Sequence, residues 1–372
     1  LQHSGHDCGW QALATTPGMA RTRGEPTPPS KDQHGASMMS PLKLAFQIVC
    51  PGGDSKLSIL IFHRVLPEPD PIFPDEPDAR RFDQVMGWVR AWFNVIPLDV
   101  AVDALRTRNL PARAMAITFD DGYADNRTIA LPILKRHGLS ATFFIATGYL
   151  DGGRMWNDTI IEAIRSSKTR RLELDDIKQF EGSRLRSLAI GSVPEKRAAI
   201  QAILGQIKYL PSSEREVASR SIAEQCDINL PDNLMMTSQQ VVEMRRAGML
   251  IGAHTVSHPI LAQLQPCDVR KEISGSKVFL EGILEEETCL FAYPNGRPDV
   301  DFQTKDASIV KELGFKAAVS TAWGTTGTDS DLMQLPRFTP WDKTRLFFGA
   351  RLIKNVFCGG PSRLDSHRGG IS

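Results

Sequence analysis

Two groups of polar residues have the types and spacing needed to bind a divalent metal ion and to move protons. Asp120 and Asp121 directly follow one apolar run of the chain, and His254 and His258 follow another. Adjacent residues that leave a strand point in different directions, so one carboxylate can bind metal while the other faces a reacting water. Two carboxylates and two imidazoles are sufficient to bind a metal ion and to leave one carboxylate as a base for metal-assisted hydrolysis.

Each group also has an alternative interpretation. The sequence Asp-Asp-Gly at 120–122 is typical of a turn. A calcium-binding loop that starts at Asp120 is excluded, because its twelfth position is Leu131 and not the bidentate glutamate that such a loop needs. Two histidines four residues apart can meet one ion on a helix or in a compact loop, and Pro259 favours the loop. A single histidine is more often structural, but the two groups together indicate a metal site.

The apolar runs alternate with segments of helical spacing, which predicts a parallel α/β architecture. Strands are expected at 57–62, 114–119, 141–146, 249–253, 290–292 and 316–320. Helices are expected at 80–93, 128–137, 237–248, 268–284 and 308–313. The polar groups therefore follow the carboxyl ends of strands. Barrels and open sheets both place ligands there, so this pattern alone leaves the two folds open.

One long segment, about 155–236, breaks the alternation and is mainly helical in pattern. Helices are expected at 194–209 and 213–226. We interpret the segment as an insertion over or beside the site. Its role as a stabilising addition or as a substrate lid stays open.

The composition is that of an ordinary soluble globular enzyme. Hydrophobic residues make up 41% and charged residues 23%, and the net charge is +1. A balanced charge gives no reason to expect nucleic acid as a partner. The six cysteines include no CxxC pair, so we expect reduced and mostly buried thiols.

The two ends of the chain differ from its centre. Residues 1–40 and 359–372 show no helix or strand period and are predicted to be disordered. No run reaches the roughly 20 apolar residues that span a bilayer. The segment Leu42–Val49 contains Lys43 and Gln47 and lacks a convincing cleavage site, so an export signal is not indicated. We expect a cytoplasmic location, with a periplasmic one or a membrane-surface contact left open.

A third motif, Phe-Ala-Tyr-Pro-Asn-Gly, lies at 291–296, after the acid pair and the histidine pair. With the acid pair and the histidine pair, it resembles the polysaccharide deacetylases, which share the NodB homology domain of carbohydrate esterase family 4. The resemblance covers roughly 57–345. It implies an irregular (β/α) barrel of about seven parallel strands, here with the helical insertion.

The resemblance also implies roles for the first two motifs. Asp121, His254 and His258 would be the metal ligands, and Asp120 would be the catalytic base. Three protein ligands leave coordination positions for water and substrate. Zinc is the first choice for this nitrogen and oxygen set, and cobalt, nickel or iron would fit similar ligands.

Two features depart from the family pattern. The arginine that often precedes the third motif is absent, and Arg337 resembles the arginine that replaces it in exopolysaccharide-type members. We expect Arg337 to orient Asp120, with an ordinary salt bridge as the alternative. The late histidine that protonates the leaving amine is also absent, since His367 lies in the tail. His63, which follows the first strand, is the candidate acid, although a structural histidine, metal-bound water or Asp120 itself are alternatives.

Substrate contacts are expected from the motif loops and from an aromatic residue in the insertion. The predicted residues are Tyr123, Tyr293, Pro294, Asn295, Trp156 and Asn157. Pro-Asn-Gly is also an ordinary turn. Trp156 and Asn157 would suit the apolar face and hydroxyls of a sugar, but Asn157 or Asp158 could equally cap a helix.

The expected activity is removal of N-acetyl groups from the amino sugars of a polysaccharide or its precursor. A second interpretation is a C–N hydrolase that acts on a small cyclic amide or an acetylated metabolite. A third is a sugar-binding relative without turnover. The retained Asp120 argues against the third, because binding alone needs no base.

Overall fold

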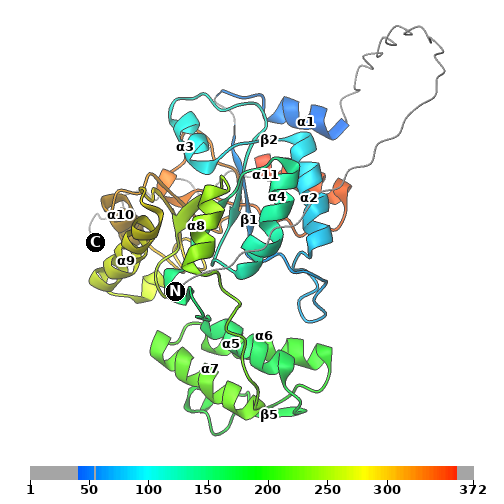
Figure 1. Cartoon of the computed structure of the whole chain (residues 1–372), viewed down its shortest axis with the longest axis vertical. Coiled ribbons are helices and arrows are strands. Elements are labelled where there is room, and N and C mark those ends of the chain that lie inside the picture. The colour runs from blue at the N-terminus through cyan, green and yellow to red at the C-terminus, as the bar shows by residue number, and fades with distance from the viewer. Residues whose placement is uncertain (1–40, 54–55, 358–372) are drawn as a thin grey trace, which may run out of the picture. The chain divides into compact units, whose positions relative to one another are not determined.

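The computed structural model describes residues 41–53 and 56–357 (Figure 1). The segments predicted to be disordered, 1–40 and 359–372, lie outside the described residues. The same holds for His367 and for two of the six cysteines.

A parallel sheet of seven strands forms the centre of the fold (Figure 1). Its path runs β1-β3-β4-β7-β8-β9, and β2 pairs with β3 in addition. The strands are β1 Ser58–Phe62, β2 Asn94–Val95, β3 Ala114–Phe119, β4 Thr142–Ile145, β7 Leu250–Ala253, β8 Leu290–Ala292 and β9 Ala317–Val319. All six predicted strands are present, which confirms the parallel α/β architecture.

A short segment after β9 closes the sheet into an irregular barrel. The backbone N–H of Leu335 donates to the carbonyl of Ala318 in β9 at 2.8 Å. Three residues later, the N–H of Phe338 donates to the carbonyl of Ile59 in β1, also at 2.8 Å. The segment thus lies between the first and last strands, which confirms the predicted irregular barrel.

Helices follow the strands as the alternation predicts. They are α2 Ala79–Trp92, α3 Leu98–Arg106, α4 Leu131–His137, α8 Ser238–Arg246, α9 Pro266–Leu284 and α10 Thr304–Glu312. A capping box between Thr237 and Gln240 begins α8, as its spacing indicates. Gly138 ends α4 with φ +63°, a left-handed conformation that glycine adopts without strain. The turn before α4, Asn126–Ala130, is a π-helix and not the α-helix expected from residue 128.

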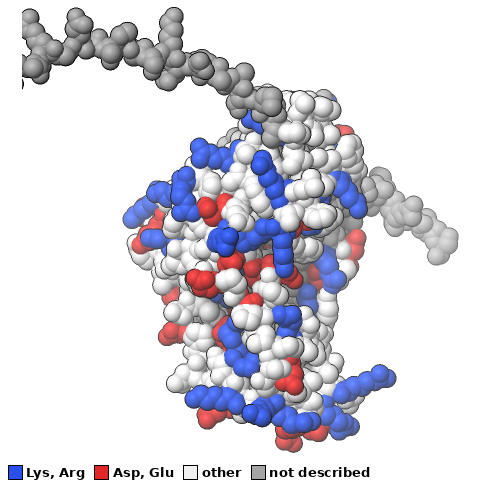
Figure 2. All heavy atoms as spheres, turned by 90° about the vertical axis from the view of Figure 1, so that its right-hand side faces the viewer, with Lys and Arg blue, Asp and Glu red and all other residues white. Residues whose placement is uncertain are grey.

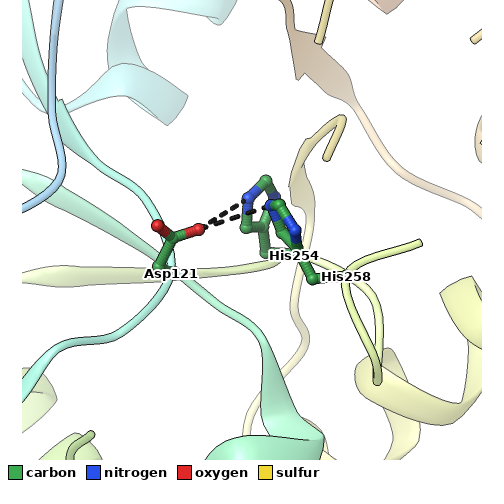
Figure 3. Close-up of side chains that lie close together, drawn as sticks. All are labelled: Asp121, His254 and His258. Atoms are coloured by element: carbon green, nitrogen blue, oxygen red, sulfur yellow. Dashed lines mark ion pairs between the residues drawn. The ribbon is translucent and has the colours of Figure 1, made fainter. Parts of the chain in front are cut away.

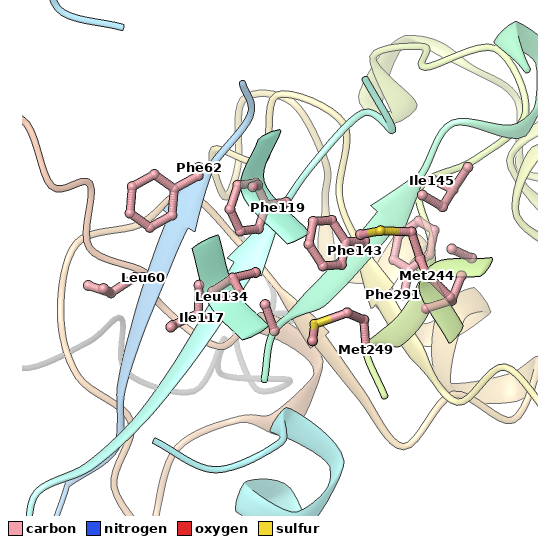
Figure 4. Close-up of a cluster of buried hydrophobic side chains, with 14 of the residues drawn as sticks. Leu60, Phe62, Ile117, Phe119, Leu134, Phe143, Ile145, Met244, Met249 and Phe291 are labelled. Carbon is pink, nitrogen blue, oxygen red and sulfur yellow. The ribbon is translucent and has the colours of Figure 1, made fainter. Parts of the chain in front are cut away.

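A stack of aromatic rings holds the centre of the sheet together (Figure 4). The rings of Phe119 in β3 and Phe143 in β4 stack with centroids 4.7 Å apart, and Phe62 in β1 stacks on Phe119 at 5.2 Å. All three side chains are buried. Because Phe119 directly precedes the acid pair, its packing fixes the backbone from which both carboxylates project.

The segment between β4 and β7 has a hydrophobic core of its own. It contains α5 Trp156–Ser166, α6 Val193–Ile207, α7 Ser212–Cys226 and a hairpin of β5 Arg171–Glu173 and β6 Ser187–Ala189. The core is formed largely by isoleucines, including Ile160, Ile164, Ile203 and Ile222. The predicted helices at 194–209 and 213–226 are confirmed. The hairpin was not expected, because its short strands alternate only weakly.

Two further helices flank the barrel, α1 Pro41–Val49 and α11 Arg345–Phe357. Phe46 of α1 is fully buried against Phe93, with ring centroids 4.5 Å apart, whereas Leu44 and Ile48 are 51% and 71% exposed. Among the described helices, none has the length and apolarity to cross a membrane. On the face drawn in Figure 2, basic and acidic side chains are interspersed.

The described cysteines vary in exposure. Cys50 and Cys226 are buried, Cys289 is half-buried and Cys267 is exposed. Only two of these four are buried, whereas the sequence predicted mostly buried thiols.

Candidate active site

Asp121, His254 and His258 converge at the carboxyl ends of the strands (Figure 3). The Oδ1 atom of Asp121 lies 3.3 Å from Nε2 of His254 and 3.4 Å from Nε2 of His258. Asp121 is the second residue after β3 and His254 directly follows β7, and these two strands lie on either side of β4. One potential ligand atom from each residue lies within 4.8 Å of the others. Residues that are far apart in the sequence therefore meet at one end of the parallel sheet.

The backbone at this site adopts conformations that residues with side chains rarely adopt. Asp121, Thr255 and His258 have φ angles of +77°, +66° and +51°. The N–H of His258 donates to Oγ1 of Thr255 at 3.0 Å, which helps to hold the turn. His258 thus lies in a compact loop, as Pro259 suggested, and not on a helix. Strained residues of this kind cluster at functional sites because the surrounding structure must hold them.

The three side chains fit a metal ion better than they fit one another. Nδ1 of His254 lies 2.7 Å from the carbonyl oxygen of Ala292, which places its proton on Nδ1 and leaves a lone pair on Nε2. That lone pair faces Oδ1 of Asp121, a buried oxygen with no hydrogen-bond partner among the described residues. Two acceptors that face each other at 3.3 Å need either a proton or a metal cation between them. The donor set of one carboxylate and two imidazoles suits a divalent ion.

Burial and neighbouring charges shift the pKa values of these three groups in different directions. Burial lowers the pKa of His258 to about 4, so its imidazole is neutral near pH 7. Burial acts on His254 in the same direction, but the carboxylates of Asp121 and Asp120 outweigh it and raise the pKa of this histidine. Burial would raise the pKa of Asp121, but the neighbouring histidines hold it well below its usual range. Asp121 is therefore an anion, as a ligand must be.

Asp120 forms a buried bidentate ion pair with Arg337. Nη1 and Nη2 of Arg337 each lie 2.7 Å from one carboxylate oxygen of Asp120. The exposed fractions of the two residues are 2% and 1%. Burial alone would raise the pKa of Asp120, but Arg337 more than offsets it and lowers that pKa. The predicted contact between these residues is present, and it keeps Asp120 ionised and in one orientation.

The barrel closure explains how Arg337 reaches Asp120. Arg337 lies in the closing segment, between Leu335 beside β9 and Phe338 beside β1. Its Nε atom donates to the carbonyl of Ser320 at 2.8 Å, and Nη1 also donates to Oγ1 of Thr118 at 3.2 Å. These bonds fix the guanidinium before it meets the carboxylate.

Replacing Arg337 with methionine is expected to destabilise the protein by about 3–5 kcal/mol, because Asp120 would be left as an unpaired buried charge. The free energy of unfolding, from denaturant titration, measures this loss. Adding Asp120→Asn to Arg337→Met should recover most of it, since the uncompensated charge is then removed. A double variant no more stable than Arg337→Met alone would contradict the account.

Two cavities meet at Asp121. One, of about 250 Å³, is also lined by His63, Glu76, Tyr123 and Asp158. The second has a similar volume, about 250 Å³, and is lined by Asp121, His258, Trp156, Asn157 and Asn295, with others from the insertion. Four predicted substrate residues, Tyr123, Trp156, Asn157 and Asn295, thus line the space around the metal ligands. His63 is exposed and faces the first cavity, where a proton donor could reach a substrate.

The third motif contributes less to this space than predicted. Tyr293 is 1% exposed, its hydroxyl donates to the carbonyl of Met333 at 2.8 Å, and its ring stacks on Phe302 at 3.7 Å. A substrate contact through its side chain is therefore wrong, because the side chain is part of the barrel wall. Pro294 is buried as well and lines neither cavity, so its predicted contact lacks support. Asn295, at φ +58°, reaches the second cavity.

The start of the insertion differs from one expected alternative. Helix α5 begins at Trp156 with Met155 as the N-cap, so neither Asn157 nor Asp158 caps it. Asp158 is 3% exposed, and the hydroxyl of Tyr123 lies 3.1 Å from both of its carboxylate oxygens. Burial raises the pKa of Asp158 to about 7. Tyr123 therefore lines the cavity with its ring while its hydroxyl is held by Asp158.

Sequence reasoning missed several charged residues of the cavities. The first cavity is lined by Arg64, Asp70, Glu76 and Arg165, and the second by Lys208 and Arg215. None of these belongs to a motif, and none follows a strand of the barrel directly. Only the packing of the insertion and of the loop after β1 brings them to the site.

Comparison with known proteins agrees with the fold and the site. A family model described as polysaccharide deacetylase matches residues 107–173 and 217–318. The matched regions include Asp120, Asp121 and both histidines, and the unmatched interval lies within the segment between β4 and β7. These matched regions belong to the polysaccharide deacetylase family.

One curated relative and two solved structures illustrate this membership. The protein named "Putative polysaccharide deacetylase YxkH" of Bacillus subtilis (strain 168) is 20% identical over 76% of this chain and 71% of its own length. The Streptococcus pyogenes deacetylase PplD, solved with acetate, is 20% identical with a TM-score of 0.52, over 81% of this chain and 98% of its own. IcaB from Ammonifex degensii is 18% identical with a TM-score of 0.52, over 82% and 97%. At these identities the structures show a shared fold.

Proposed function

We propose that this protein is a metal-dependent hydrolase that removes N-acetyl groups from the amino sugars of a polysaccharide or its precursor. The match to the polysaccharide deacetylase family supports deacetylation of polysaccharides in general. The observation that supports a metal-dependent mechanism is the pair of adjacent carboxylates, each of which has different neighbours. Asp121 faces the two histidines, whereas Asp120 is held by Arg337.

Asp121, His254 and His258 would hold the ion, and we propose zinc, with cobalt, nickel or iron as ions that fit the same donors. When bound, a divalent ion supplies Lewis acidity toward an acetamide carbonyl and lowers the pKa of water.

The remaining residues of the site handle protons. Asp120, ionised and oriented by Arg337, accepts a proton from the water that attacks the acetamide carbon. The C–N bond then breaks, acetate leaves, and the sugar nitrogen takes up a proton to leave as a free amine. His63 faces the same cavity as Asp121 and is our candidate donor of that proton.

Replacing His63 with alanine should lower kcat and remove the basic limb of the pH–rate profile. A general acid must be protonated, so activity falls as pH rises through its pKa, and this fall disappears with the acid. Acetate release across a pH series measures the effect, expected to be about a hundredfold at the optimum. An unchanged basic limb would assign the proton to another group.

The cavities favour an oligosaccharide over a small amide. The second cavity at Asp121 shares the lining residues Trp156 and Arg215 with a third cavity of about 580 Å³. The space beside the site is therefore large enough for more than one sugar ring. The test compares acetate release from N-acetylglucosamine, from its tetramer and from simple acetamides. A kcat/KM that rises with chain length supports the proposal, and one that is highest for acetamides favours a small-molecule amide hydrolase.

A further inference from the structure

The insertion places two basic side chains in the cavity that contains the metal ligands. Lys208 directly follows α6, and Arg215 lies in the first turns of α7. Both line the cavity of about 250 Å³ that is also lined by Asp121 and His258. The family model has no counterpart for Lys208 or Arg215, which lie in its unmatched interval.

Arg215 is a buried charge without an acidic partner. Its exposed fraction is 4%. Its Nη atoms donate to the carbonyl of Lys208 at 3.4 Å and to Oγ of Ser212 at 3.0 Å, and the guanidinium lies 5.1 Å from the centroid of the Trp156 ring. Nε has no hydrogen-bond partner among the described residues, and no described carboxylate forms an ion pair with Arg215. Glu216 attracts Arg215 electrostatically but is exposed to solvent.

Lys208 adds a second positive charge that no acid neutralises. It is half-buried, and its Nζ lies 5.5 Å from the centroid of the Tyr209 ring. Within the described chain it forms no ion pair, and the nearby acid Asp301 is already paired with Arg297. Burial lowers the pKa of Lys208, and the opposing effect of Asp301 is offset further by the positive charges of Arg297 and Arg215.

Charged groups buried in proteins are normally paired, because removing them from water is costly. Neither of these two cations forms an ion pair with a described carboxylate, so an anion from outside the chain would find two partners beside the cavity. Arg215 lines a pocket wide enough for a ligand, and the planar guanidinium of arginine is suited to bind carboxylate and phosphate oxygens.

We propose that Lys208 and Arg215 form a subsite for an oxyanion carried by the acetylated glycan, on the reacting sugar or on its neighbour. This inference rests on the proposed function and narrows its substrate class to anionic glycans. A carboxylate on a sugar and a phosphate on a linked precursor share the required chemistry. Neutral N-acetylglucosamine oligomers would leave the subsite without its ligand.

The test compares the activity of metal-loaded protein on three substrates. An alternating glycan of N-acetylglucosamine and N-acetylmuramic acid carries carboxylates, uridine-diphosphate N-acetylglucosamine carries phosphates, and the N-acetylglucosamine tetramer is neutral. Arg215→Met and Lys208→Met should each lower kcat/KM for one anionic substrate about ten- to a hundredfold, mainly through KM, the range for hydrogen bonds to a charged group. Activity on the neutral tetramer should fall clearly less than activity on that anionic substrate, because only the anionic substrate loses a charged contact. The anionic substrate that is affected identifies the source of the charge.

The control is Arg186→Met, which removes an exposed arginine of the same insertion that pairs with Asp175. It should leave all three substrates unaffected. Equal losses on neutral and anionic substrates in Arg215→Met would overturn the subsite, because they would indicate a structural role. Lys208 is half-buried, so its variant carries the same test if Arg215→Met fails to fold, as circular dichroism would report.

A binding measurement separates this inference from the proposed function. Calorimetric titration of metal-loaded Asp120→Asn with the same three compounds needs no turnover. Tighter binding of an anionic compound, lost when Arg215→Met is added, supports the subsite even if no acetate is ever released. Binding that is equal for charged and neutral compounds overturns it, whatever the activity.

Discussion

Replacing Asp120 with asparagine is expected to lower kcat for acetate release by about a hundred- to ten-thousandfold while leaving the bound metal in place. Asparagine has nearly the same shape but cannot accept a proton from water. Asp120 faces Arg337, and the proposed metal ligands are Asp121 and the two histidines, so the ion should stay bound. Acetate release and metal analysis of the same purified sample measure both effects.

An acid elsewhere on the protein provides the control. Asp83 pairs with Arg136 and His137, and its side chain is 42% exposed. Asp83→Asn should leave both kcat and metal content unchanged. If Asp120→Asn loses the metal together with its activity, the two carboxylates do not have the separate roles that their surroundings indicate.

The second large effect is expected from the metal ligands. His254→Ala should reduce the metal content from about one ion per chain to nearly none after dialysis, because two ligands hold a divalent ion too weakly. Activity should fall in proportion. The ring of His254 is buried and bonded to the carbonyl of Ala292, so some loss of stability is also expected and circular dichroism should accompany the metal analysis.

His137 offers a matched control for this variant. Its side chain is only 17% exposed and its Nε2 lies 2.7 Å from Asp83, so it is a partly buried histidine with a carboxylate neighbour. His137→Ala should keep about one ion per chain. Full metal occupancy in His254→Ala would remove this residue from the ligand set and leave the proposed site without support.

The strands and the ligand positions could be predicted because short-range patterns determine them. Apolar runs of strand length predict buried parallel strands, and residues that directly follow such strands must meet at one end of the barrel. This reasoning placed Asp121, His254 and His258 together without knowledge of the strand order. It could not say how the barrel closes, because residues 335–338 join the sheet through single bridges and have no strand pattern of their own. The position of Arg337 therefore came from the resemblance.

The directions of side chains and the packing of the insertion could not be predicted from the sequence. Whether Tyr293 faces the groove or the barrel wall depends on the alternation of β8, a strand of only three residues whose exact end a pattern cannot define. Lys208 and Arg215 have the sequence surroundings of ordinary surface residues. Their burial depends on how the insertion packs, and the local hydrophobic periodicity of the sequence does not indicate that packing.

The most direct test of the central claim is acetate release from N-acetylated oligosaccharides, neutral and anionic, by zinc-loaded protein with Asp120→Asn alongside. The account predicts that wild type releases acetate and forms one free amine for each acetate, that chelation stops the reaction, and that Asp120→Asn is inactive. Failure of metal-loaded wild type to release acetate from any of these glycans would contradict the assignment of this site as an N-deacetylase.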